Sequence, residues 1–306
     1  MWIEGAEGAG MEPQYYAEFL ERLGHTVREA NGVYWYNVFS HAWTCFPLET
    51  QLSPAEIDLH GILGDDRGGI VRYCCRVDEG VGGFRHVVSG RDYDLKSLES
   101  KARNQTRQGL ERCVCGPVDG PEIAREGIEL HAETLIRQER RLSAGYEAYW
   151  LRYFQAVSVC PSATVWTSRC DGQLAAFLIS FKIGSVENIC IVRSRAELLR
   201  NRPNNALLFT FLQWALQRDD TSEVCIGLQS LQSQLSSLEV FKRCMGFRDE
   251  PIGQRIEMQT PLGITVPLFA ARLAGNIAGR MGGEYAARLA GALAIYSSQP
   301  RIRRAA

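Results

Sequence analysis

The stretch from residue 186 to 247 constrains the fold most, because it alternates short apolar runs with helical patterns. The first run, 189–192, is short and β-branched, which is typical of a buried strand. Pro203 suits the first position of a helix, and residues 206–216 are apolar on nearly every face, which predicts a buried helix. A second apolar run at 224–226 and a second helical pattern follow. This order predicts a βαβα unit in an α/β protein.

The end of this stretch carries a short motif. Gly227 and Leu228 close the second strand, and the chain later reads Phe241-Lys242-Arg243-Cys244-Met245-Gly246-Phe247. This pattern resembles the "GL…FK..FG" ending of FemABX-type proteins, a family of tandem GNAT-like aminoacyl and acyl transferases. The resemblance implies a mixed α/β, GNAT-like acyltransferase fold in two tandem halves.

Turn residues and composition divide the chain into three parts. Glycine-proline pairs near residue 120 predict a boundary between an N-terminal GNAT-like half, 1–120, and a C-terminal acyltransferase half, 121–265. Asn31-Gly32 and Asp171-Gly172 each lie between strand-like runs and predict one hairpin in each half. Residues 266–306 form a third part, for which apolar residues at helical spacing predict a basic, amphipathic helical tail.

The tail leaves two interpretations open. It carries six arginines and one glutamate, whereas the whole chain has a net charge of -1. Its apolar stripe either packs on the protein or contacts the anionic inner face of a membrane. The sequence has no run of 18 apolar residues and no secretory leader, so we expect a cytoplasmic protein without a spanning helix.

The ten cysteines are scattered and form no C-x-x-C pair, and the five histidines are not grouped with them. This pattern favours reduced thiols over a zinc site or disulfides, so we expect no metal. Cys190 and Cys225 lie within predicted core strands, where a thiol acts as a small hydrophobe.

The family resemblance implies that Lys242 stabilises the oxyanion of an acyl transfer, with Phe241 as its packing partner. The alternative is an ordinary lysine at the C-terminal end of a helix, where a cation is favoured. Glu187, at the start of the first strand, could act as a base or orient an amine, although an acid there is more often simply solvated.

Donor binding is expected at the segment Arg200-Asn201-Arg202-Pro203-Asn204, which stands where GNAT enzymes have a glycine-containing pyrophosphate turn. Because this segment has no glycine, its backbone is expected not to approach a pyrophosphate closely. This departure counts against ordinary acetyl-CoA binding and agrees with the FemABX pattern, in which the donor is often aminoacyl-tRNA.

Two further groups complete the predicted binding residues. A polar helix is predicted at 94–109, where Arg103 and Arg107 could face phosphates; the alternative is a solvated helix face. Gln229 and Ser230 follow the second strand, at the edge where α/β sheets bind ligands.

Together these features predict an acyltransferase that forms an amide by moving an acyl or aminoacyl group onto a small-molecule or peptidyl amine. Its co-substrate would be aminoacyl-tRNA or acyl-CoA, without a tightly bound cofactor. One alternative is an acyl-CoA-dependent GNAT N-acetyltransferase with a divergent cofactor loop, and another is a non-catalytic GNAT-like binding module. The sequence leaves the oligomeric state open.

Overall fold

A computed structural model describes residues 12–66, 68–137, 142–229, 236–258 and 284–301. The chain divides into two compact units that interleave along the sequence. Among the described residues, the first unit contains 12–23, 86–227 and 237–248, and the second contains 24–85, 228–229, 236, 249–258 and 284–301. The boundary expected at residue 120 therefore falls within the first unit.

The first unit holds most of the helices and the long stretch from which the fold was inferred. In chain order it contains α1 (Glu12–Arg22), η2 (Leu95–Ser97), α3 (Ser100–Arg112), β6 (Val114–Val118), α4 (Gly120–Arg137), α5 (Tyr146–Ser158), β7 (Ala163–Cys170), β8 (Gln173–Ile183), β9 (Val186–Ser194), η3 (Ala196–Asn201), α6 (Pro203–Gln217), β10 (Glu223–Leu228) and α7 (Ser236–Cys244). Leu228, the last residue of β10, and Ser236, the first residue of α7, belong to the second unit.

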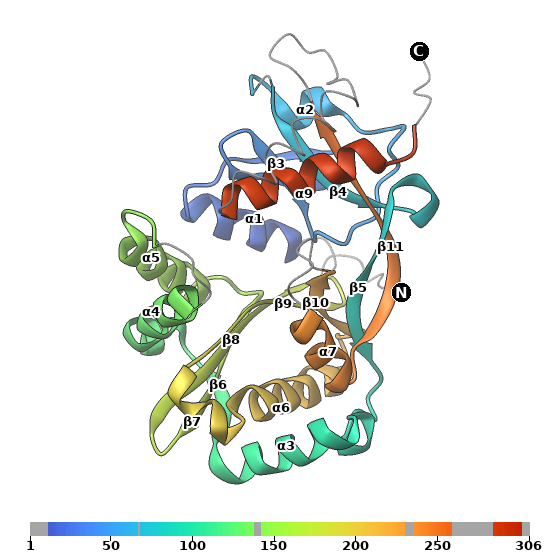
Figure 1. Cartoon of the computed structure of the whole chain (residues 1–306). Helices are drawn as coiled ribbons and strands as arrows, with labels where there is room; N and C mark the ends of the chain where they lie inside the picture. The colour runs from blue at the N-terminus through green and yellow to red at the C-terminus, as the bar shows by residue number, and fades with distance from the viewer. Residues whose placement is uncertain (1–11, 67, 138–141, 230–235, 259–283, 302–306) are drawn as a thin grey trace, which may run out of the picture. The chain divides into compact units, whose positions relative to one another are not determined.

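The sheet of the first unit has the order β10-β9-β8-β7-β6 and lies between two helical layers (Figure 1). Helix α6 covers one face together with α3, and α4 and α5 lie on the other face (Figure 1). Helix α6 is buried almost all round, as its continuous apolar pattern predicts, and packs on Trp166, Leu178 and Val224 of three strands. This burial fixes the N-terminus of α6 beside the end of β9.

The predicted hairpins are both present. Asn31 and Gly32 have φ angles of 55° and 70°, and Asp171 and Gly172 have 51° and 79°. Positive φ at both central residues is what a type I′ hairpin turn requires, which explains why Asn-Gly and Asp-Gly occur there. The first joins two strands of the second unit and the second joins β7 to β8.

The second unit contains β1 (Val27–Ala30), β2 (Val33–Phe39), β3 (Ala42–Phe46), α2 (Leu59–Leu63), β4 (Ile70–Cys75), η1 (Val77–Glu79) and α9 (Glu284–Ser298). It also holds most of β5 (Val81–Ser89) and β11 (Arg248–Met258), and its strand order is β1-β2-β3-β4-β11-β5. Its core is an apolar cluster around Trp35, Ile62 and Tyr73.

Helix α9 packs on the second unit. Leu293, Ile295 and Tyr296 form a buried cluster with Ile256 and Met258 of β11. The Gln299 side chain also accepts a hydrogen bond from the Ile256 N–H (3.0 Å) and donates one to its carbonyl (2.9 Å). This part of the tail therefore follows the packing interpretation, while 266–283 lies outside the described residues. None of the described helices is long and apolar enough to span a membrane.

Candidate functional site

Strands β9 and β10 pair over only a short part of their length. Their parallel ladder joins Glu223–Cys225 to Val186–Asn188, and among the described residues no pair joins the two strands beyond this point. Strand β9 nevertheless continues to Ser194 and β10 to Leu228. Separated parallel strands leave backbone N–H and C=O groups facing the gap, where they can bind an external carbonyl.

A β-bulge in β9 lies at the start of this split. On the side of β8, Ile179 pairs with Ile191 and Ser180 pairs with Ile189, so Cys190 is the additional residue. Cys190 is exposed, and the prediction that it is a core hydrophobe is therefore wrong. The sequence does not signal this bulge, and bulges generally bend the strand in which they lie.

Lys242 reaches the same split from helix α7. Its side chain is buried, and its Nζ atom donates a hydrogen bond to the carbonyl of Ile226 at 3.1 Å. Ile226 is the first residue of β10 beyond its last pair with β9, so the ammonium group lies where the strands separate. Phe241 is half-buried against the core beside α6. A buried ammonium needs such partners because desolvation would otherwise disfavour its charge.

The segment predicted to bind the donor forms the turn from β9 into α6. Arg202 caps this helix with φ 60° and ψ 39°, so a left-handed backbone conformation that favours glycine occurs here with an arginine. Gly109 of α3 lies against the carbonyl of Arg202, and a Cβ atom at Gly109 would be only 2.6 Å from that oxygen. Asn204 donates from Nδ2 to the Ser194 hydroxyl at 3.0 Å, and Arg200 is exposed.

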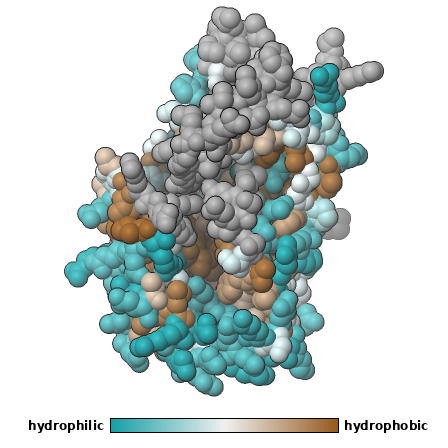
Figure 2. Space-filling model, in the orientation of Figure 1, coloured by the Kyte–Doolittle hydropathy of each residue, from teal (hydrophilic) through white to brown (hydrophobic). Residues whose placement is uncertain are grey.

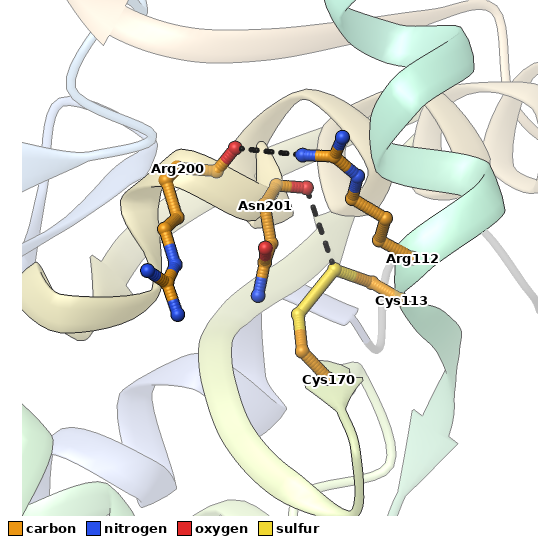
Figure 3. Close-up of a disulfide and its surroundings, with 5 residues drawn as sticks. All are labelled: Arg112, Cys113, Cys170, Arg200 and Asn201. Carbon is orange, nitrogen blue, oxygen red and sulfur yellow. Dashed lines mark hydrogen bonds between the residues drawn. A yellow bond between two sulfur atoms is a disulfide. The ribbon is translucent and has the colours of Figure 1, made fainter.

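A disulfide ties this turn to its surroundings, which corrects the prediction that all cysteines are reduced. Cys113, directly after α3, is bonded to Cys170 at the end of β7 (Figure 3). The Cys113 sulfur lies 3.7 Å from the Asn201 carbonyl, and Arg112 donates a hydrogen bond to the Arg200 carbonyl at 3.3 Å (Figure 3). The turn at residues 200–204, called the donor turn below, is thus held by Arg112 and Cys113 at the end of α3. Gly109 of the same helix contacts the turn at the Arg202 carbonyl.

Glu187 does not share these surroundings. It lies at the paired end of β9, opposite Val224, whereas the donor turn follows the other end of the same strand. The residue is 1% exposed and lines a small cavity with Lys182, Arg218 and Asp220; Lys242 does not line this cavity. Burial raises the pKa of Glu187 to about 7, against the opposing effects of the Ser180 hydroxyl and the two cations.

The remaining predicted binding residues lie on α3 and directly after β10. Arg103 donates to the carbonyls of Leu95 and Leu98 at 2.8 and 3.0 Å, so its guanidinium group braces the start of its own helix. Arg107 is exposed on α3, over which the surface is mainly hydrophilic at the bottom of Figure 2. The backbone N–H of Gln229 bonds to the Phe84 carbonyl within the second unit, and Ser230 lies outside the described residues.

No family model matches the sequence, and no curated protein sequence matches it. Solved structures do match the fold. FemX superposes with a TM-score of 0.56 at 12% identity, covering 81% of this chain and 92% of FemX. The C-terminal domain of a putative lysylphosphatidylglycerol synthetase from Agrobacterium fabrum gives 0.53 at 15% identity, covering 78% of this chain and 86% of that one.

L-PGS from Bacillus licheniformis gives a TM-score of 0.50 at 13% identity, covering 84% of this chain and 94% of that protein. These identities are low, so the comparison bears on the fold alone. The mixed α/β fold expected from the sequence is confirmed: this chain has a FemX-like fold.

Proposed function

We propose that this chain transfers an acyl or aminoacyl group to an amine at the split between β9 and β10, forming an amide. The observation that carries the proposal is the position of the Lys242 ammonium group at Ile226, where the two strands separate next to a bulge. The names of FemX and of the lysylphosphatidylglycerol synthetase are consistent with a transferase.

In the proposed step, the amine attacks the carbonyl carbon of the donor and the carbonyl oxygen becomes an oxyanion. Backbone N–H groups of β9 beyond Asn188 would bind this oxygen, and Lys242 would add a positive charge. The bond to the donor's thiol or hydroxyl then breaks, and that group takes up the proton which the amine loses. We leave Glu187 out of this step because its carboxyl group lines a separate cavity.

The donor in this proposal carries phosphates, as both acyl-CoA and aminoacyl-tRNA do. The α6 N-terminus has backbone N–H groups without helical partners, and the left-handed Arg202 leads the chain into it. Arg200 and Arg202 add cationic side chains. Both donors occur in the cytoplasm, where we place the reaction, and the burial of Cys113 and Cys170 would limit access of reductants to their disulfide.

The test has two parts. Coenzyme A, an acyl-CoA ester and aminoacyl-tRNA are compared for their effect on the thermal midpoint, because a ligand of the native state raises it. Transfer to a panel of amines is then measured for the parent, for Lys242→Met and for Arg243→Gln, whose exposed cation lies next in the same helix.

Loss of about 100-fold or more in the transfer rate is expected for Lys242→Met, as for other oxyanion donors, with donor binding retained. The Arg243→Gln control should keep its rate. Full activity in folded Lys242→Met would remove the proposed role of Lys242. Absence of any donor response in the parent would instead favour the non-catalytic binding module.

A further inference from the structure

A small polar cavity lies where the first unit's sheet meets the C-terminal end of α6. It has a volume of about 120 Å³ and is lined by residues from four places in the chain: Tyr15 of α1, Pro161, Ser162 and Thr164 around the start of β7, Lys182 and Glu187 on β8 and β9, and Arg218 and Asp220 after α6. Lys182 and Glu187 are cross-strand partners on either side of a short turn. The proposed transfer step uses none of these residues.

The charges of this cavity are arranged by depth. Glu187 lies deepest, with 1% of its surface exposed. The side chains of Lys182, Arg218 and Asp220 are 12%, 37% and 53% exposed, so they lead outward to the mouth. A molecule that enters the cavity therefore meets a carboxyl group at the floor and two cations along the wall.

The buried carboxyl group of Glu187 and the charged groups nearer the mouth differ in whether they have hydrogen-bond partners. Arg218 donates to both carboxylate oxygens of Asp220 at 3.0 and 2.9 Å, and the Lys182 ammonium lies 3.3 Å from the same group. These bonds hold the pKa of Asp220 well below its usual range. The Oε1 atom of Glu187, in contrast, is buried without a hydrogen-bond partner, and so is the hydroxyl of Ser180, whose proximity lowers the pKa of this carboxyl group against the effect of burial. A buried carboxyl oxygen without a donor is costly, and a ligand that brings a donor would remove this cost.

We propose that this cavity binds a small free α-amino acid, with its ammonium group against Glu187 and its carboxylate toward Lys182 and Arg218. An ammonium group supplies three donors to the acid at the floor. A carboxylate is the natural partner of a guanidinium group, so the ligand would share Arg218 and Lys182 with Asp220. The hydroxyl groups of Ser162 and Thr164 add donors on the β7 side. A simple amine leaves the cationic wall unused, and a simple carboxylate leaves Glu187 without a partner.

Size selects among amino acids. A cavity of about 120 Å³ has room for several water molecules or one small ligand. Glycine and alanine, with five and six non-hydrogen atoms, fit such a space, whereas the ring of phenylalanine would have to extend out of the mouth. The ligand class is therefore a small zwitterion.

Binding is expected to depend on pH through Glu187. With a pKa of about 7, its carboxyl group is half-protonated at neutral pH, and an incoming ammonium group favours the ionised form. Binding near pH 7 should therefore release about half a proton. Below pH 7 the affinity should fall by about tenfold per pH unit, because the proton competes with the ligand. The other charged groups that face Glu187 are Lys182, Arg218 and Asp220, and none of these ordinarily titrates in that range.

The test is isothermal titration calorimetry on the full chain at pH 7, in two buffers with different heats of ionisation. Glycine and alanine are compared with methylamine, acetate and phenylalanine. The test variant is Glu187→Gln. The control variant is Asp219→Asn, in which a neighbouring carboxylate outside the cavity is removed. We expect glycine or alanine to bind at least tenfold more tightly than either one-charge analogue, to release about half a proton, and to lose at least tenfold in affinity in Glu187→Gln alone.

Acetate binding as tightly as glycine would overturn the proposal, since Glu187 would then have no role. Undiminished binding to Glu187→Gln would do the same, as would the absence of heat with every amino acid at millimolar concentration. Should Glu187→Gln fail to fold, the pH dependence of the parent decides instead: an affinity that is flat between pH 6 and pH 8 contradicts the proposal. These readouts measure binding only, so they stand whether or not acyl transfer is found.

Discussion

Replacing Glu187 with glutamine tests how much the buried acid costs the fold, independently of any ligand. Glutamine keeps the shape of the side chain and removes the ionisable group. The pKa of Glu187 rises from an ordinary value of 4.5 to about 7 on folding. A change of one pH unit in a pKa corresponds to about 1.4 kcal/mol, so ionising this buried group costs the native state about 3 kcal/mol relative to the unfolded chain.

The direction follows from the raised pKa. Below pH 4.5 the group is neutral in both states and costs nothing as a charge. As the pH rises from 4.5 to 7, the unfolded chain loses this proton while the native state retains it, so stability falls until the pH passes the folded pKa. The parent should therefore lose about 3 kcal/mol relative to Glu187→Gln between pH 4.5 and pH 8.

Urea denaturation of the parent, Glu187→Gln and the control Asp219→Asn at pH 5 and pH 8 measures this difference. The transition that reports on the first unit is the relevant one, because β9 belongs to it. Parallel behaviour of the parent and Glu187→Gln at the two pH values would refute the reasoning. It would mean that the cavity solvates the carboxylate, or that Lys182 turns to pair with it.

Three further predictions concern the packing around the two units. Reduction of the disulfide between Cys113 and Cys170, which are 57 residues apart, should destabilise the first unit by up to about 4 kcal/mol. Denaturation with and without dithiothreitol measures this loss, and a Cys244→Ser control should respond like the parent. Gly109→Ala should weaken donor binding in a thermal-shift titration, because its Cβ would press on the Arg202 carbonyl, whereas Gly116→Ala, with open space around it, should not. Gln299→Ala should lower the protection of α9 amides from hydrogen exchange by about 1–3 kcal/mol, because two backbone groups of Ile256 lose their partners. Ser298→Ala, at an exposed position, serves as the control, and equal protection in the two variants would contradict this prediction.

The elements that the sequence predicts well are those set by local chemistry. Asn31-Gly32 and Asp171-Gly172 determine their turns through positive φ angles, and Pro203 begins α6 because its fixed φ suits a first helical position. The position of Lys242 at the split could be anticipated only through the family motif, since a lysine near the end of a helix is otherwise unremarkable.

The features that the sequence could not reveal depend on pairing between distant segments. The bulge at Cys190 arises from a register shift against β8, and the disulfide joins two cysteines without a recognisable spacing. Arg103 belongs to a basic helix that suggested phosphate binding, yet its donors are used by nearby carbonyls. One feature of the sequence could have pointed to the cavity around Glu187. Lys182 and Glu187 are placed symmetrically about the turn at Gly184 and Ser185, which predicts that they pair across the two strands.

The left-handed conformation of Arg202 bears on how such a site can change during evolution. A residue with a side chain pays about 1–2 kcal/mol to adopt this conformation, and glycine does not. Substitution by glycine would therefore keep the course of the chain into α6 while removing the guanidinium group. In the proposed donor site, a single replacement would thus separate recognition of an anion by a cationic side chain from recognition by backbone N–H groups. Proteins with this fold could therefore exchange anion binding by an arginine for anion binding by backbone N–H groups through one substitution that does not destabilise the turn.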